Sequence, residues 1–197
     1  MNTKWMIAGA GVLAVAGGLP WVVGYVTEQQ WHQATAEVND AQPFLRMETD
    51  NYERGILGAR FRGSVNLINP ETGESQKLAY RANVTHGVTG SLMDFQPEDG
   101  WAAGDSDWFS GEEPKLTLET RLWGTAVLEL EAPQMTLTDP DTGETLASSG
   151  GLARIEVSEA GSQADALMVW PGVTLSGPDL DIQVSDFRLE QTMSHLT

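Results

Sequence analysis

The residues that could do chemistry in this chain lie far apart, and the best motif among them is an incomplete calcium loop. Asp139, Asp141 and Glu144 surround Gly143, and carboxylates at alternate positions are how a calcium loop supplies ligands. The full EF-hand pattern requires more ligands and two flanking helices, which this segment does not have. A tight turn accounts for the same residues, because Asp starts such turns and Gly accepts a positive φ. We therefore expect no metal site and no cofactor.

The three histidines do not form a recognisable site either. His32, His86 and His195 are widely separated, and none of them has the spacing of a metal-ligand pair. No nucleophile elbow, phosphate-binding glycine loop or dinucleotide fingerprint occurs in the sequence. We therefore expect a protein that is not an enzyme, and we assign no catalytic residue. A hydrolase assembled from distant residues, with His86 and His195 as its candidates, is kept as the second alternative.

The charge balance excludes several other classes of function. The 197 residues include 28 Asp and Glu but only 11 Lys and Arg, which gives a net charge of −17. Proteins that bind nucleic acid gather basic residues against the phosphate backbone, so we expect no nucleic-acid partner. Cysteine is absent, which excludes disulfides, thiol catalysis and zinc sites built on cysteine. Packing and strand pairing must therefore hold the fold together.

The N-terminal region has the features of a membrane anchor. Residues 5–26 contain no charged side chain, and as a helix rising about 1.5 Å per residue this run matches a hydrocarbon core of about 30 Å. Lys4 precedes the run and no basic residue follows it before Arg46, so the positive-inside rule places the N-terminus in the cytoplasm. Residues 14–16 (Ala-Val-Ala) also suit cleavage of a signal peptide, and that alternative stays open. We expect residues 1–26 to form the cytoplasmic N-terminus and a transmembrane helix.

The anchor is expected to continue into a short stalk helix over residues 27–42. Trp31, Ala34 and Val38 fall on one helical face of this segment, which predicts a stripe that packs on the domain behind it. The helical pattern ends before Pro43.

Residues 43–197 show the alternating pattern of β-strands. A period of two is typical of strands with one buried and one solvated face, and such sheets are antiparallel. No second helical stretch is convincing, so we predict a mainly β, antiparallel periplasmic domain that forms a curved sheet or a sandwich. The strands are expected at residues 60–68, 77–85, 115–122, 125–137, 154–157, 166–170, 173–175 and 180–189.

Two tight turns and one long loop are expected between these strands. Residues 69–74 (Asn-Pro-Glu-Thr-Gly-Glu) and 139–144 (Asp-Pro-Asp-Thr-Gly-Glu) have the same turn chemistry. Residues 94–114 are acidic and rich in glycine and aromatic side chains, and a polar loop of this length is uncommon in a compact domain. Its candidates for contact with a partner are the aromatic residues Trp101, Trp108 and Phe109.

Two short motifs with glycine near predicted strand ends carry a family resemblance. Tyr52-Glu53-Arg54-Gly55-Ile56 precedes the first predicted strand, and His86-Gly87 follows the second. Together with Pro20 near the end of the apolar run and the polar helix after it, these motifs make the chain resemble the YdgA-like family, a bacterial domain of unknown function. The resemblance singles out five motif residues without giving them a role: Tyr52, Arg54, Gly55, His86 and Gly87.

The resemblance implies an inner-membrane protein with a periplasmic β-rich body, and it implies no activity. It corresponds to the N-terminal portion of the family, whose members continue with further β-rich sequence. We therefore expect a membrane-anchored periplasmic scaffold or binding module of a Gram-negative cell envelope, held in the bilayer by residues 5–26. Its expected partner is an envelope protein or a second copy of the chain. The first alternative is a β groove that binds a lipid or another apolar ligand.

Overall fold

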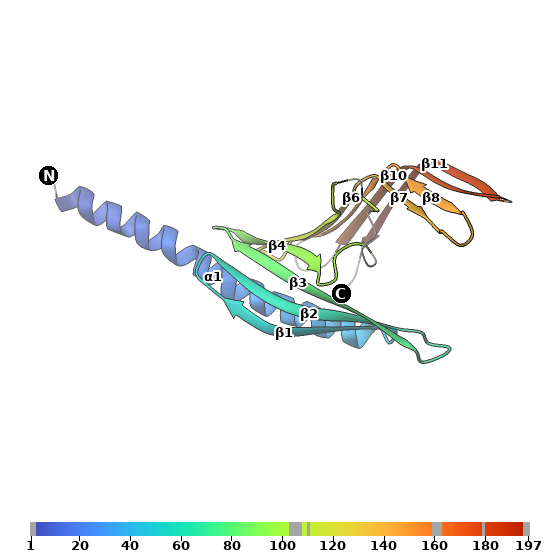
Figure 1. Cartoon of the computed structure of the whole chain (residues 1–197). Helices are drawn as coiled ribbons and strands as arrows, with labels where there is room; N and C mark the ends of the chain where they lie inside the picture. The colour runs from blue at the N-terminus through green and yellow to red at the C-terminus, as the bar shows by residue number, and fades with distance from the viewer. Residues whose placement is uncertain (1–2, 103–107, 110, 159–162, 179, 195–197) are drawn as a thin grey trace. The chain divides into compact units, whose positions relative to one another are not determined.

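The computed structural model describes residues 3–102, 108–109, 111–158, 163–178 and 180–194, with side chains described from residue 18 onward. Within these residues one helix is followed by eleven strands (Figure 1). They are α1 (Thr3–Ala41), β1 (Leu45–Arg54), β2 (Gly58–Ile68), β3 (Ser75–His86), β4 (Gly90–Pro97), β5 (Lys115–Arg121), β6 (Ala126–Ala132), β7 (Met135–Thr138), β8 (Thr145–Ser148), β9 (Gly151–Val157), β10 (Gln163–Gly177) and β11 (Leu180–Ser194).

The mainly β, antiparallel fold that the sequence predicts is confirmed. Neighbouring strands pair antiparallel, and in the described residues they belong to one open sheet. The sandwich that was the other expected arrangement is therefore not found in this part of the chain. The chain divides into two compact units, unit 1 (Met1–Glu98 and Glu119–Leu122) and unit 2 (Asp99–Leu118 and Trp123–Thr197).

Helix α1 packs one face against the sheet of unit 1 (Figure 1). Among the described residues, no helix has both the length and the apolar character that crossing a bilayer requires. The transmembrane helix expected over residues 5–26 is thus without support from the fold. The packing face already begins within that run, and its buried residues recur every three or four positions, with Gly24 next to Val23: Pro20, Val23, Gly24, Thr27 and Trp31.

The C-terminal end of α1 differs from the predicted stripe at one position. Trp31 is buried and Val38 is half-buried, as predicted, but Ala34 is exposed and a half-buried Thr35 continues the face instead. The physical reason is that the packing face follows Pro20 to Trp31, and Thr35 rather than Ala34 lies four residues beyond it. Asn39 then ties the helix end to β1. Its side-chain amide donates to the Met47 carbonyl at 2.8 Å, and its oxygen accepts from the Met47 amide at 2.6 Å.

The core of unit 1 lies between α1 and the sheet β1-β2-β3-β4. Trp31 is central to it, because its ring centroid lies 5.1 Å from that of Phe61 and 5.6 Å from that of Phe95. The indole N–H also donates to Thr49 Oγ1 at 2.9 Å. The other buried apolar residues of this core are Val23, Ala59, Tyr80, Ala82, Val84 and Met93. Burial of each large side chain contributes about 1.5–3 kcal/mol.

A β-bulge near the end of β1 decides which of its side chains face α1. The pairing of β1 with β2 shifts register between Asp50 and Glu53, and Asn51 has a φ of 57°. Before the bulge the half-buried positions are odd-numbered, whereas Tyr52 and Arg54 are the half-buried positions after it. The extra residue therefore turns both motif side chains toward the helix.

Unit 2 contains the strand order β6-β9-β10-β8-β7, with β11 paired to β10 over its whole length. Apolar residues of β10 lie directly opposite apolar residues of β11, as in the pairs Met168–Leu189 and Val173–Val184. Each pair shares a face of the sheet. Val173 is five positions from Met168, but Asp186 (φ 53°) interrupts the alternation of β11 between the two pairs, and Trp170 Nε1 donates to Ser148 Oγ, which lies opposite Val173. Both pairs therefore lie on the same apolar face. Many of its side chains are exposed, among them Leu128, Ile155, Met168, Ile182, Val184, Phe187, Leu189 and Met193.

The two tight turns expected from the sequence are confirmed. The Asn69 amide donates to the Glu74 carbonyl and the Asp139 amide donates to the Glu144 carbonyl, both at 2.8 Å. Gly73 and Gly143 both have a φ of 73°, which only glycine adopts without strain. The turns close the β2–β3 and β7–β8 hairpins.

Candidate functional site

The five motif residues of the sequence meet at one end of unit 1: Tyr52, Arg54, Gly55, His86 and Gly87. β1 and β3 both end there, so the turn to β2 and the turn to β4 lie next to each other. The His86 amide donates to the Leu57 carbonyl at 2.9 Å and so links the two turns. The fold thus brings together motif residues that lie more than thirty positions apart in the chain.

Gly55 and Gly87 occupy matching positions in these two turns. The Gly55 amide donates to the Gly58 carbonyl at 2.7 Å, and the Gly87 amide donates to the Gly90 carbonyl at 2.8 Å. At each glycine a Cβ would lie 3.1 Å from that same carbonyl oxygen. A larger residue would therefore crowd the hydrogen bond that closes the turn, which explains why both motifs contain glycine.

Arg54 fastens the end of β1 to α1. Its guanidinium forms an ion pair with the Glu28 carboxylate at 2.8 Å. The same guanidinium carbon lies 5.4 Å from the ring centroid of Trp21 and 5.3 Å from that of Tyr25. The cation is therefore held by a carboxylate and by two aromatic faces, all supplied by the helix.

His86 belongs to a buried polar bridge between the sheet and α1. Its Nδ1 lies 2.9 Å from Ser91 Oγ, which in turn lies 2.8 Å from Thr27 Oγ1. Gly24 sits over the other ring nitrogen, since a Cβ there would lie 2.7 Å from His86 Nε2. That nitrogen is buried without a hydrogen-bond partner.

The surroundings of His86 favour its neutral form. Burial lowers the pKa of the imidazole below its ordinary value of 6.5, and the nearby positive charge of Arg54 lowers the pKa further. An unprotonated imidazole beside a hydroxyl is the arrangement of a base and a nucleophile. His86 and Ser91, however, are only 4% and 3% exposed, and the Gly24 backbone covers the ring. In this arrangement the pair joins α1 to the sheet and offers no surface to a substrate.

Tyr52 completes the cluster from the other side of Arg54. Its ring stacks on Phe61 with centroids 5.1 Å apart, and its hydroxyl is buried without a hydrogen-bond partner. Burial, assisted by the Glu28 carboxylate, raises the pKa of Tyr52 to about 12. The phenol thus stays protonated and contributes packing rather than charge.

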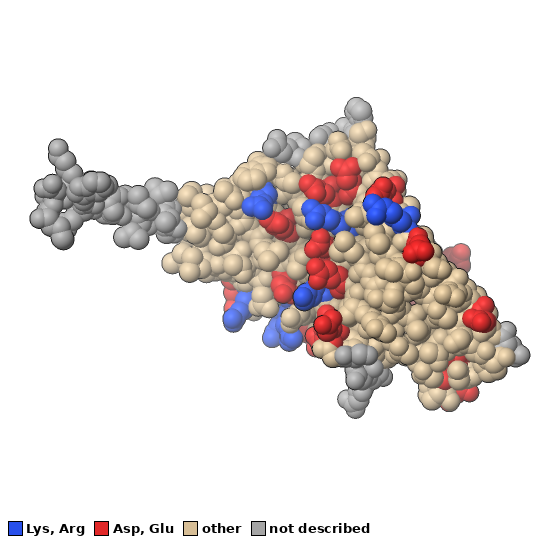
Figure 2. Space-filling view, turned by 90° about the horizontal axis from the view of Figure 1, so that it is seen from above, with Lys and Arg blue, Asp and Glu red and all other residues tan. Residues whose placement is uncertain are grey.

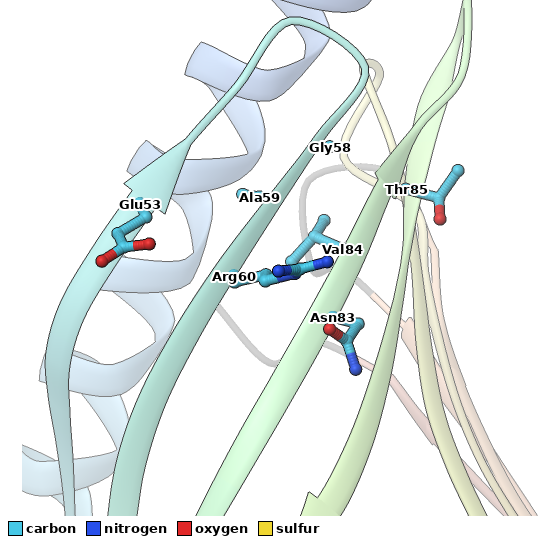
Figure 3. Close-up of a pocket in the computed structure, with 7 residues that line it drawn as sticks. All are labelled: Glu53, Gly58, Ala59, Arg60, Asn83, Val84 and Thr85. Carbon is cyan, nitrogen blue, oxygen red and sulfur yellow. The ribbon is translucent and has the colours of Figure 1, made fainter.

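A shallow depression lies on the opposite face of the unit 1 sheet (Figure 3). Its volume is about 430 Å³, and exposed polar side chains from three strands line it, among them Glu53, Arg60 and Asn83. Figure 3 shows these side chains on strands that run in front of α1. Over the described residues there is no group of three or more His, Cys, Asp or Glu side chains that could hold a metal ion.

The other candidates from the sequence are not part of this cluster. Trp101, Trp108 and Phe109 belong to unit 2 and are half-buried. The rings of Trp108 and Phe109 meet edge to face with centroids 6.4 Å apart, and the Trp108 carbonyl accepts from the Thr136 amide at 3.0 Å. His195 lies outside the described residues.

Sequence reasoning missed the partners that α1 supplies to the motif residues. The sequence analysis assigned these partners to an anchor or a stalk: Trp21, Tyr25, Thr27 and Glu28. Thr27 and Glu28 nevertheless lie in the cluster of motif residues. The available signal was the spacing of Pro20, Val23, Gly24, Thr27 and Trp31, which marks a packing face rather than a uniformly apolar helix.

Comparison with known proteins gives a family and nothing more specific. Residues 2–197 match the family described as "Bacterial protein of unknown function (DUF945)". No curated protein and no solved structure matches the chain.

Proposed function

The chain belongs to the DUF945 family of bacterial proteins of unknown function, and from this premise we propose that it is a membrane-anchored, non-enzymatic binding module of the bacterial cell envelope. In this proposal residues 5–26 hold it in the inner membrane of a Gram-negative cell, with the N-terminus in the cytoplasm and the body in the periplasm. The uncharged run and the position of Lys4 support this placement. The YdgA-like resemblance is consistent with the family and is part of the proposal.

The observation that carries the binding role is the exposed apolar face of unit 2. Ile182 and Phe187 of β11 are 49% and 42% exposed, and Ile155 of β9 is 42% exposed. Single exposed apolar residues are ordinary, but a contiguous patch of them marks an interaction surface. We infer that this face binds an apolar ligand such as a lipid acyl chain, with the sheet curving around it.

The charge of unit 2 narrows the class of ligand. It contains only three of the chain's 11 basic residues, Lys115, Arg154 and Arg188, and more than half of its 28 acidic residues. Arg154 and Arg188 are already paired with glutamates. An anionic headgroup would find few partners here, so the contact is to the apolar part of the ligand.

The test is binding of a ligand to the full chain in mild detergent. Native mass spectrometry of gently extracted protein should show a co-purifying apolar ligand, and the uncharged dye N-phenylnaphthylamine should compete with it. Replacing both Ile182→Ser and Phe187→Ser should weaken dye binding about tenfold, since about 1.4 kcal/mol of apolar contact corresponds to that factor.

Gln183→Ser is the matched control, because Gln183 lies on the opposite face of the same strand. It should leave dye binding unchanged. A ligand-free mass together with no dye binding would sink the apolar-ligand role. Crosslinking in intact membranes then decides whether a protein partner or a second copy occupies the face. Failure of both tests, with no apolar ligand bound and only the monomer recovered after crosslinking, would remove the binding-module proposal as a whole.

A further inference from the structure

Unit 1 exposes a cluster of large apolar side chains where α1 passes the end of the sheet. Two are on α1, two form the β1–β2 turn and one is in the β3–β4 turn. Their exposure runs from 48% for Tyr25 to 67% for Leu57. We call these five the collar residues: Trp21, Tyr25, Ile56, Leu57 and Val88.

Contacts already described place the collar residues at the same position along the axis of α1. The Arg54 guanidinium, two residues before Ile56, lies against the rings of both Trp21 and Tyr25. The Leu57 carbonyl binds the amide of His86, two residues before Val88. The turns and this part of α1 therefore form one continuous surface within unit 1.

The collar faces the direction in which α1 continues toward the N-terminus. Figure 1 shows α1 extending past the end of β1 and β3 on that side. In Figure 2 the surface next to the N-terminal part of the chain shows no Lys, Arg, Asp or Glu on the face in view. The apolar turns therefore lie beside the C-terminal end of the uncharged run, residues 5–26.

The length of the uncharged run, residues 5–26, indicates that the collar residues lie at the surface of the membrane. The packing face holds α1 on the sheet from Pro20 onward, which leaves residues 5–19 in front of it. As a helix these residues would span about 22 Å, which is short of a hydrocarbon core of about 30 Å. Including α1 as far as Tyr25 adds about 9 Å and makes up the difference. The two turns lie at that level and would enter the membrane with it.

We propose that the collar residues of unit 1 insert into the interfacial layer of a lipid bilayer and seat the end of the sheet on the membrane. This inference rests on the membrane anchoring proposed above. Trp and Tyr are the side chains that favour the interface, while Ile56, Leu57 and Val88 supply apolar depth. Arg54 does not oppose insertion, because Glu28 neutralises it and two rings cover it.

The absence of cysteine from the chain makes the test direct. Single variants Leu57→Cys and Val88→Cys are labelled with an environment-sensitive fluorophore. The full chain is then reconstituted into vesicles of phosphatidylethanolamine and phosphatidylglycerol. Thr72→Cys is the matched control, because its turn lies at the far end of β2 and β3, about 35 Å away along the strands.

Spin-labelled lipids should quench the fluorophores at positions 57 and 88 several-fold more than the fluorophore at position 72, whereas aqueous iodide should show the reverse order. If the protein floats with the vesicles but all three positions are quenched equally, the collar proposal is wrong and the proposed membrane anchor is not affected. Protein that does not float with the vesicles overturns the anchor itself, and the collar with it. Shielding from iodide at 57 and 88 without lipid quenching assigns the surface to a protein partner and also overturns the proposal.

Discussion

Unit 1 and unit 2 use the same alternating strand pattern, but among the described residues a helix is seen packed only on the sheet of unit 1. Phe61, Val84 and Met93 of unit 1 are between 0% and 4% exposed. Among the described residues of unit 2, Ala164 is buried, whereas Met168 and Met193 near it are exposed. Alternation therefore determines which side of a strand is apolar, whereas burial depends on what covers that side.

The two units also differ in charge, in a way that matches this difference in packing. Unit 1 holds most of the basic residues, and Arg54 among them stabilises the contact between sheet and helix. Unit 2 is strongly acidic. Charge of one sign keeps a sheet with an exposed apolar face soluble and discourages edge-to-edge association. In unit 1, α1 covers the apolar face of the sheet. In unit 2, the negative charge counters association through the exposed apolar face.

The largest expected effect is the loss of the ring that joins α1 to the sheet. Trp31→Ala should lower the free energy of unfolding of unit 1 by about 3–5 kcal/mol, because it removes a buried indole and its contacts with Phe61 and Phe95. Trp170→Ala in unit 2 should cost only about 1–2 kcal/mol, since that ring is half-buried. Urea unfolding followed by circular dichroism gives the totals, and hydrogen exchange assigns each loss to its unit. Equal losses would contradict the comparison.

The next effect tests how closely α1 approaches the sheet. Gly24→Ala should destabilise unit 1 by about 1–3 kcal/mol, because the new methyl would lie 2.7 Å from His86 Nε2. Gly18→Ala in the same helix is the control, since no atom lies within 4 Å of its Cβ position. It should stabilise the helix by up to about 1 kcal/mol. Thermal unfolding of both variants checks the signs, and a loss at Gly18 equal to that at Gly24 would show that packing over His86 is not the cause.

Much of the sheet could be predicted from the sequence, and the missed strands have specific causes. Strands β2, β3 and β5 begin and end within two residues of their predicted bounds. β1 was missed because no residue in it is fully buried and the bulge at Asn51 interrupts its alternation. β4 was missed in part because residues 94–97 were assigned to the acidic loop, although they continue a strand that starts at Gly90.

The cluster at the end of unit 1 could be predicted only in its outline. The glycines after Arg54 and His86 marked strand ends correctly. The pairing of Arg54 with Glu28, and of His86 and Ser91 with Thr27, depends on how α1 lies on the sheet. A strand pattern gives the faces of the sheet, but it does not say which turn of a helix covers them.

The pH dependence of stability should separate the units next. Because burial lowers the pKa of His86 in the folded state, the unfolded chain takes up a proton first as the pH falls below about 6.5. The contribution of His86 to stability is then lost as the pH falls through about 6.5 toward the lowered pKa of the folded state. The measurement is the difference in free energy of unfolding between the native chain and His86→Asn, because the pH-dependent contributions that both chains share cancel in it. The difference in free energy of unfolding between the two chains should shrink in unit 1 as the pH falls. A difference that does not depend on pH would contradict a neutral, buried His86.

The smallest expected effect is at Val184, when the same substitution is made in each unit. Val84 of β3 is 4% exposed and Val184 of β11 is 45% exposed, and Val→Thr preserves shape and strand propensity while adding a hydroxyl. In unit 1 that hydroxyl would be buried without a partner, so Val84→Thr should cost about 1–3 kcal/mol. In unit 2 water can bind it, and Val184→Thr should stay within about 0.5 kcal/mol of the native chain. Urea unfolding measures both.

A large loss of stability in Val184→Thr would mean that something covers the apolar face of unit 2 in solution. The measurement is then repeated after the apolar ligand has been extracted. If the ligand is what covers the face, Val184→Thr no longer lowers the free energy of unfolding. If a second copy covers the face, the loss in free energy of unfolding depends on protein concentration.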